Sequence, residues 1–248
     1  IADGISMPML GFGTFMNTGA DCERTVAEAI HTGYRLIDTA EAYGNEEQVG
    51  REIKAGMENS LRLLGTDYLD LVLLHWPFAD YYTAWRELEK LHKAGYICAI
   101  GVSNFEPDRL IDLIAYNDFK PVINQIETHL YCQRQAEHLW EDKYNVAHMA
   151  YAPLGQGQAN EMFTEPLVQE IAAKYGKAAA QVLLRRTMQD HTIVIPKSVH
   201  SERIAENFNV FDFELTTAEM KLLATLDKKV PMIGKPETPE LVEFSLTW

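Results

Sequence analysis

The sequence has few cysteines, a shortage of positive charge and no long apolar run. Cys22, Cys98 and Cys132 are its only cysteines, and no two of them form a Cys-x-x-Cys pair. This excludes a disulfide framework and predicts buried thiols in a reducing compartment. No apolar stretch approaches the roughly 20 residues that a membrane-spanning helix needs, and no secretory signal is recognisable. We therefore expect a cytoplasmic protein that does not associate with membranes.

Basic residues are outnumbered by acidic ones. Lys and Arg total 22 against 36 Asp and Glu, which gives a formal net charge of -14. Nucleic acids and anionic membrane surfaces repel such a protein, so neither is expected as its main partner. Hydrophobic residues make up 47% of the chain, which is enough for a sizeable core. The eight histidines show no paired spacing with cysteines or carboxylates, so no metal site is predicted.

The chain also lacks a linker, a repeat or a biased segment, and residues 1–248 are predicted to form a single domain. It does contain a regular alternation of β-rich runs and helical stretches. That alternation is typical of parallel βαβ units, and about 250 residues is the usual size of a (β/α)₈ TIM barrel. Asp3 and Gly4 predict an N-terminal β-hairpin ahead of the barrel. The predicted strands cover residues 10–14, 34–38, 68–75, 97–103, 122–127, 146–151 and 192–197.

Several helix boundaries are marked by the residues that usually begin or end helices. Pro107 is expected in the first turn of one helix, where proline is tolerated. Thr164 is expected to cap a second helix, which Gly176 ends. Thr216 and Glu219 have the spacing of a capping box at the start of a third.

One barrel strand is missing from the alternation. Between Asp38 and His75 the sequence holds two helical segments and no strand. A barrel cannot close with a gap at one strand, because every strand needs two ladder partners. The third strand is therefore predicted to be absent near the junction of Lys54 and Ala55. Either the protein has lost this strand, or the protein contains it and the 248-residue sequence omits it. We favour the second explanation.

Polar residues gather at the carboxyl ends of the predicted strands. Each has an ordinary structural explanation: a strand-end aspartate often forms a turn, a loop tyrosine often packs, and a histidine before Trp-Pro is usually structural. As a set on one rim of a barrel, however, such groups are typical of a catalytic site. The set is Asp38, Tyr43, His75, Ser103, Asn104, Gln125, Tyr151, Lys197 and Ser198.

Six segments resemble the signatures of the aldo-keto reductase family, in the family's order and over essentially the whole chain. They are LGFGT at 10–14, RLIDTAEAYGNE at 35–46, DYLDLVLLHWP at 67–77, IGVSNF at 100–105, NQIE at 124–127 and IPKS at 195–198. The resemblance is to bacterial reductases of the 2,5-diketo-D-gluconate reductase type. It implies an NADP-dependent oxidoreductase that reduces aldehydes, ketones or keto sugars to alcohols.

The resemblance also implies the catalytic roles. Tyr43 corresponds to the general acid that protonates the carbonyl oxygen, and His75 to the residue that orients the carbonyl. An unperturbed tyrosine has a pKa of about 10, and in the family a lysine on the third strand, paired with the counterpart of Asp38, eases its proton release. Lys54 is expected at a helix end facing solvent, so it is no substitute. The chain thus holds Asp38, Tyr43 and His75 without the fourth member.

NADPH is the implied cofactor. Gly11 and Gly13 lack the third glycine of the dinucleotide-binding fingerprint, so a Rossmann site is not predicted. By resemblance, Ser103, Asn104 and Gln125 hold the nicotinamide carboxamide, while the Tyr151 ring stacks on the nicotinamide. The implied cofactor-binding residues are Gly13, Thr14, Asp38, Ser103, Asn104, Gln125, Tyr151, Pro153, Leu154, Gly155, Gln156, Lys197, Ser198, Arg203, Glu206 and Asn207.

The adenosine end of the predicted site lies after the last strand. Lys197 and Arg203 are six positions apart across a strand-to-helix turn, so both can reach one phosphate at a helix N-terminus. This favours NADP over NAD. Glu206 and Asn207 match family positions that pair with adenine. Without the resemblance, a capped helix with surface charges is the simpler interpretation.

A small-molecule carbonyl is the expected partner, and no oligomer is required. Phe15, Trp76, Phe78 and Trp248 can line an apolar mouth, which suits small aldehydes, α-dicarbonyls or keto sugars. Two alternatives stay open: a non-catalytic NADP-binding homologue acting as a sensor or interaction subunit, and a purely structural barrel. The predicted substrate-binding residues are Phe15, Tyr43, His75 and Trp76.

Overall fold

The computed structural model describes residues 6–17, 19–40, 61–62, 64–157, 160–233 and 238–245. Within them, strands and helices alternate as the sequence predicts. The strands are β1 (Phe12–Gly13), β2 (Ile37–Asp38), β3 (Leu69–Leu74), β4 (Ile97–Ser103), β5 (Ile123–Glu127), β6 (Ala147–Tyr151) and β7 (Ile193–Val194). The helices are α1 (Gly19–Thr32), α3 (Tyr81–Lys93), α4 (Pro107–Ala115), α5 (Gln135–Tyr144), α6 (Asn160–Thr164), α7 (Pro166–Tyr175), α8 (Ala179–Gln189), α9 (Ser201–Phe208), α10 (Thr217–Ala224) and α11 (Pro239–Ser245).

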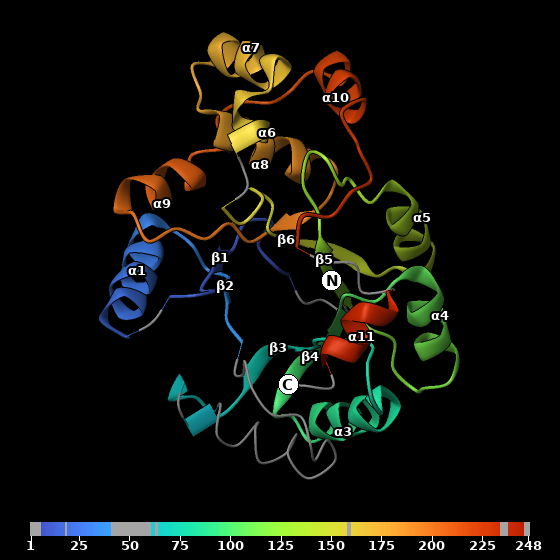
Figure 1. The fold of residues 1–248 in the computed structure, drawn as a ribbon. Helices are drawn as coiled ribbons and strands as arrows, with labels where there is room; N and C mark the ends of the chain where they lie inside the picture. The colour runs from blue at the N-terminus through green and yellow to red at the C-terminus, as the bar shows by residue number, and fades with distance from the viewer. Residues whose placement is uncertain are drawn as a thin grey trace.

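The strands form a curved, all-parallel arc with helices around it (Figure 1). β3 to β7 pair in sequence order, and β1 pairs with β2. A bridge between Leu10 and Val194, with Gly11 N donating to Val194 O at 2.8 Å, joins β1 to β7. The order is therefore β2-β1-β7-β6-β5-β4-β3, which confirms the predicted (β/α) barrel class.

Among the described residues, the arc is open between β2 and β3. In the part of the chain that the structure describes, no strand lies between them. This opening is where the predicted third strand would fit. The Lys54–Ala55 junction lies outside the described residues, as does the predicted hairpin turn at Asp3 and Gly4.

Apolar side chains fill the space between the strands and the surrounding helices. Trp85 and Leu88 of α3 pack against β4 residues Ile97 and Val102, and all four are buried. Burying one large apolar side chain contributes about 1.5–3 kcal/mol. Contacts of this kind hold each helix on its strands and fix the strand ends on which the polar rim depends.

Two of the predicted helix starts are confirmed. Pro107 occupies the first turn of α4. Thr216 caps α10, since its hydroxyl accepts from Glu219 N at 3.2 Å while Glu219 Oε2 accepts from Thr216 N at 2.7 Å.

The predicted cap at Thr164 is wrong. α6 ends at Thr164, and α7 begins at Pro166 with Glu165 as its N-cap. Proline disfavours helical geometry in the residue before it, so the chain breaks at this point into two helices. Gly176 ends α7 as predicted, with a φ of 62°.

The prediction of buried cysteines holds only in part. Cys132 is buried, but Cys98 on β4 is exposed. None of the helices in the described ranges combines the length and apolar character that crossing a bilayer requires.

Candidate active site

Polar residues at the ends of β3, β4 and β5 are joined by hydrogen bonds. Ser103 Oγ donates to Gln125 O at 2.7 Å. Asn104 Nδ2 donates to His75 O at 3.1 Å and to Ser103 Oγ at 3.2 Å. The structure thus brings four of the predicted site residues together on one rim.

Asn104 turns the chain at the end of β4. Its φ of 61° is left-handed, a conformation that asparagine tolerates better than most residues. Its side-chain carbonyl accepts from the Tyr151 hydroxyl at 2.9 Å, which fixes the Tyr151 ring at the end of β6. Burial raises the pKa of Tyr151, so this hydroxyl stays protonated and remains a donor.

Asp38 and Gln125 meet across the barrel interior. Gln125 Nε2 donates to Asp38 Oδ1 at 2.9 Å, and the same nitrogen lies 3.0 Å from Met149 Sδ. Desolvation raises the pKa of the partly buried Asp38, and the Gln125 hydrogen bond opposes that rise. Asp38 forms no ion pair within the described ranges. The sequence pattern did not reveal this contact; a carboxylate without a cation takes the nearest donor.

Residues after β1 fix the end of β2. The backbone N and the Oγ1 of Thr14 both donate to Asp38 O, at 3.0 and 2.9 Å. Gly13 permits close packing, because a Cβ there would lie 3.0 Å from Ile195 O. Both residues are buried at the predicted rim.

His75 follows β3, next to two aromatic residues. Its ring lies 5.3 Å from that of Trp76, and the Trp76 and Phe78 rings stack at 5.4 Å. Desolvation by surrounding protein atoms lowers the pKa of His75, although the residue is exposed. This shift favours the neutral ring. Phe15 is exposed after β1, and Tyr43 and Trp248 lie outside the described residues.

The loop after β6 has an unusual backbone. Ala152, Gly155 and Gln156 have φ values of 48°, 74° and 43°. Left-handed conformations at residues other than glycine cost energy and often mark functional sites. Pro153 and Gly155 are buried, while Gln156 is exposed. Together with half-buried Leu154, they form a tight turn at the same rim, where the sequence predicts a pyrophosphate contact.

Two exposed cations lie near the start of α9: Lys197 in the turn after β7, and Arg203 in the first turn of the helix. The side chains of Lys197 and Arg203 form no ion pair or hydrogen bond with another residue in the described ranges. Ser198 Oγ accepts from His200 N at 3.1 Å, which shapes the turn. At the other end of α9, Glu206 is exposed and Asn207 is buried.

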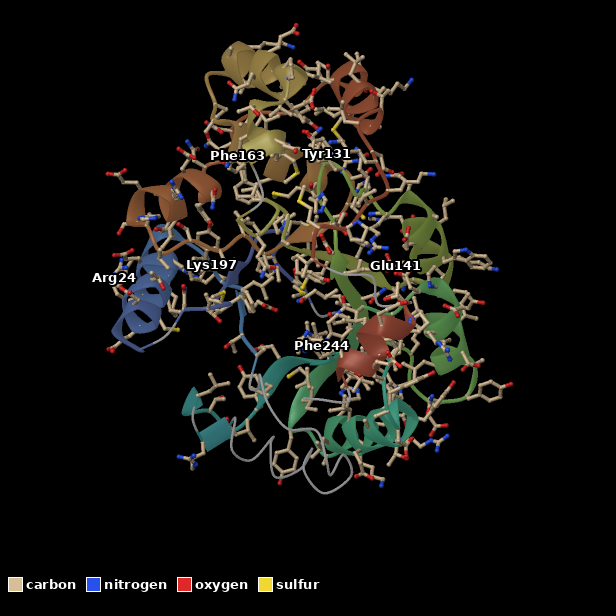
Figure 2. The ribbon with its side chains drawn as sticks, in the orientation of Figure 1. Arg24, Tyr131, Glu141, Phe163, Lys197 and Phe244 are labelled. Carbon is tan, nitrogen blue, oxygen red and sulfur yellow. The ribbon has the colours of Figure 1, made fainter. Side chains whose placement is uncertain are left out.

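Arg24 is a supporting residue that the sequence analysis missed. It extends from α1, as Figure 2 shows, and donates to Val199 O at 3.0 Å. It also pairs with Glu28 at 3.1 Å, and a hydrogen bond with Ser201 lowers the pKa of Glu28. The spacing of Arg24 and Glu28 is readable on a predicted helix. The contact with Val199, 175 positions away, is not.

Glu127 was also missed as a supporting residue. Its buried carboxylate accepts from Met232 N at 2.5 Å and from Ile233 N at 3.2 Å. His129 Nε2 lies 3.1 Å from the same carboxylate. The chain after α10 is thereby held against the end of β5, beside the polar rim.

Comparison with known proteins identifies a family to which the chain is similar. The model of the aldo/keto reductase family matches residues 51–228. An aldo-keto reductase of Mycobacterium sp. (strain JLS) is 40% identical over 266 residues, covering 95% of each chain. Methylglyoxal reductase DkgA of Salmonella typhimurium is 38% identical over 98% of this chain and 96% of its own. Morphine 6-dehydrogenase of Pseudomonas putida is 37% identical over 98% and 95%.

Solved structures share the fold. The apo form of Gox0644 has a TM-score of 0.88 and is 34% identical, with 94% of each chain covered. A variant of Gox0644 in complex with NADPH has a TM-score of 0.87 and the same identity, over 96% of each chain. A Bombyx mori aldo-keto reductase in complex with NADP has a TM-score of 0.85 and is 29% identical, over 94% of this chain and 93% of its own.

The alignment lengths bear on the missing strand. The Mycobacterium alignment runs over 266 positions, more than the 248 residues of this chain, so that relative has residues with no counterpart here. The identities, the coverage and the shared fold establish that the chain belongs to the aldo/keto reductase family.

Proposed function

We propose that this chain is an NADPH-dependent carbonyl reductase that converts aldehydes, ketones or keto sugars to alcohols. In this proposal Tyr43 is the general acid and His75 orients the carbonyl. The observation that carries the proposal is the hydrogen-bonded set of His75, Ser103 and Asn104 at neighbouring strand ends. Family membership supports the same reaction class. A cytoplasmic location is part of the proposal, as is activity without an oligomer.

The rim residues fit a nicotinamide cofactor, which supplies the hydride when bound. Gln125 Oε1 has no hydrogen-bond partner within the described ranges, so it can accept from a carboxamide N–H. The Tyr151 ring, held through Asn104, offers a flat face for stacking. Lys197 and Arg203 suit a phosphate group. NADP and NADPH in the solved relatives support the choice of cofactor.

In this proposal, the transfer of a proton from Tyr43 to the carbonyl oxygen limits the rate of reduction. The neutral His75 ring can donate an N–H to the carbonyl oxygen and orient it beside Tyr43. The Tyr43 hydroxyl then gives its proton to that oxygen as the carbonyl carbon is reduced. Among the residues that the structure describes, Asp38 is paired with an amide and with no cation, so these residues provide nothing that eases this proton release. We therefore expect slow turnover compared with relatives that have the lysine.

The proposed substrates are small carbonyl compounds. The stacked Trp76 and Phe78 rings beside His75 provide an apolar wall. One relative is named for methylglyoxal and another for morphine. A substrate panel therefore includes small aldehydes, α-dicarbonyls and keto sugars, together with a bulky ring ketone.

NADPH consumption with this panel tests the proposal. Tyr43→Phe is expected to lower kcat by about 100-fold or more, the usual contribution of a positioned general acid. Tyr116→Phe, at an exposed tyrosine after α4, serves as the matched control and should leave the rate unchanged. If Tyr43→Phe retains the original rate, the general acid is misassigned.

A second candidate is a non-catalytic NADP-binding homologue that acts as a sensor or interaction subunit. The hydrogen bond from Gln125 to Asp38, in place of an ion pair, favours it. In that case NADPH fluorescence would report saturable binding while no member of the panel is reduced. Measurable reduction that depends on Tyr43 would exclude this candidate.

A further inference from the structure

A second polar cluster lies on the outside of the strand arc. His138 and Glu141 project from α5, and His148 lies near the start of β6. One ligand atom from each of the three lies within 4.8 Å of the others. Figure 2 shows Glu141 beside α5, on the other side of the molecule from Lys197. The cluster is therefore separate from the candidate active site.

The sequence analysis predicted no metal site, on the ground that no histidine has paired spacing with a carboxylate. That premise is wrong. His138 and Glu141 are three positions apart on one helix, which places them on the same face. His148 comes from a different element and alternates with Met149, whose sulfur reaches Gln125 in the interior, so His148 faces outward to α5.

Both ring nitrogens of His148 are engaged. Nε2 lies 2.7 Å from Thr128 Oγ1, which also lies 3.2 Å from Ile126 O. The other nitrogen, Nδ1, lies 2.5 Å from Glu141 Oε2. A metal ion that binds there takes the place of the hydrogen shared by these two atoms, because a histidine ligand must present a free lone pair.

The other two ligands are also held in position. Asn124 Nδ2 donates to Glu141 Oε1 at 2.8 Å, which leaves Oε2 to face the cluster. His138 Nε2 lies 3.3 Å from Thr192 Oγ1, and His138 Nδ1 has no partner within the described ranges. Partners that orient ligands in this way are the usual second layer of a metal site.

A cavity of about 250 Å³ opens onto the two histidines. Asp142 and Asp190 line it, and their charges favour the entry of cations. The His138 and His148 rings stack with centroids 3.9 Å apart. His138 is only half-buried, so its ring has room to turn toward the other two ligands.

We propose that His138, Glu141 and His148 bind a divalent transition-metal ion, with water from the cavity completing its coordination. Two imidazoles and one carboxylate favour Zn²⁺, Co²⁺ or Ni²⁺ over Mg²⁺ and Ca²⁺, which prefer oxygen ligands. The bound ion crosslinks α5 to β6. It stabilises the folded chain, because it binds that state in preference to the unfolded one.

Titration of the full-length chain with ZnCl₂ tests this proposal. One equivalent is expected to bind with a Kd of about 10 μM or tighter, and Co²⁺ should give visible absorption bands of a nitrogen- and oxygen-coordinated ion. His138→Ala should weaken binding at least about tenfold. This variant keeps the bonds among Glu141, His148 and Thr128, so its fold should persist. His31→Ala, at an exposed histidine of α1, is the matched control and should bind as before.

Thermal unfolding gives an independent measurement. Zn²⁺ should raise the Tm of the unmodified chain and of His31→Ala, and raise that of His138→Ala clearly less. Mg²⁺ should shift none of them. An equal rise with Zn²⁺ in all three proteins would place the ion elsewhere, and the absence of saturable binding would mean that only a proton occupies the cluster. Either result overturns the proposal.

Discussion

The Asp38 carboxylate accepts a hydrogen bond from the Gln125 amide inside the barrel, and burying its charge there lowers the free energy of unfolding. Desolvation raises its pKa, so its contribution to stability is full at low pH and falls as the pH rises through the folded-state pKa. Asp38→Asn keeps an acceptor for Gln125 and removes the charge. We expect the free energy of unfolding at neutral pH to rise by about 0.5–2 kcal/mol.

Urea denaturation at two pH values checks this expectation. The difference between Asp38→Asn and the unmodified chain should be largest at neutral pH and should shrink in acid, where Asp38 is protonated. A variant that is less stable at neutral pH would show that the Asp38 charge is compensated by a group outside the described residues.

Arg203 is proposed to bind the phosphate that distinguishes NADPH from NADH. Arg203→Ala should therefore weaken NADPH binding about tenfold or more, with little effect on NADH. Fluorescence titration with both cofactors measures this, and Arg86→Ala, at an exposed arginine of α3, is the matched control. Equal losses for NADPH and NADH would show that the phosphate assignment is mistaken.

For single residues, the sequence predicted the positions of the site residues better than it predicted their hydrogen-bond partners. Ser103, Asn104 and Gln125 lie at one rim as expected, because parallel strands align their carboxyl ends. The hydrogen bond from Gln125 to Asp38 spans 87 positions and depends on how the strands curve around the interior. No local spacing encodes that curvature, and the family resemblance implied other partners for both residues.

Among the helices, α10 has the most clearly defined start. Desolvation opposes ionisation of Glu219, but hydrogen bonds from Lys174 and Thr216 prevail and lower its pKa to about 2. Its stabilising effect is therefore full above the ordinary carboxyl pKa and is lost as the pH falls toward 2. Glu219→Gln should lower the free energy of unfolding by about 1 kcal/mol at neutral pH.

The same substitution should have less effect in acid, which urea denaturation near pH 3 can measure. Glu202→Gln, at an exposed glutamate in the first turn of α9, serves as the comparison. If the effect of Glu219→Gln is equal at both pH values, the ionised form of Glu219 contributes nothing at this cap.

Whether a segment forms a strand or a helix was easier to predict than the residues at which it begins and ends. All seven predicted strands exist, because their β-rich runs differ clearly from the helical stretches between them. β1, β2 and β7 are shorter than their runs, since ladder pairing depends on neighbours that the sequence does not show. The error at Thr164 has a local cause, because Pro166 begins a new helix two residues later.

At the scale of the whole molecule, the opening that the described residues leave between β2 and β3 carries the largest prediction. Inserting the corresponding segment of a relative at the Lys54–Ala55 junction should close the arc and supply the family's lysine. We expect kcat to rise by about 100-fold or more and the Tm to increase. An insertion with methionine in place of that lysine should raise the Tm alone. No gain in either quantity would show that the strand is not what the chain lacks.

The seam between β1 and β7 has a consequence for synthesis in the cell. Leu10 pairs with Val194, so β1, which is synthesised first, can complete this pairing only after β7 has been synthesised. At ordinary translation rates of about 5–20 residues per second, that delay is on the order of 10–40 s. Throughout this interval the nascent β1 has one ladder edge without its final neighbour, and the arc can form only after most of the polypeptide has left the ribosome.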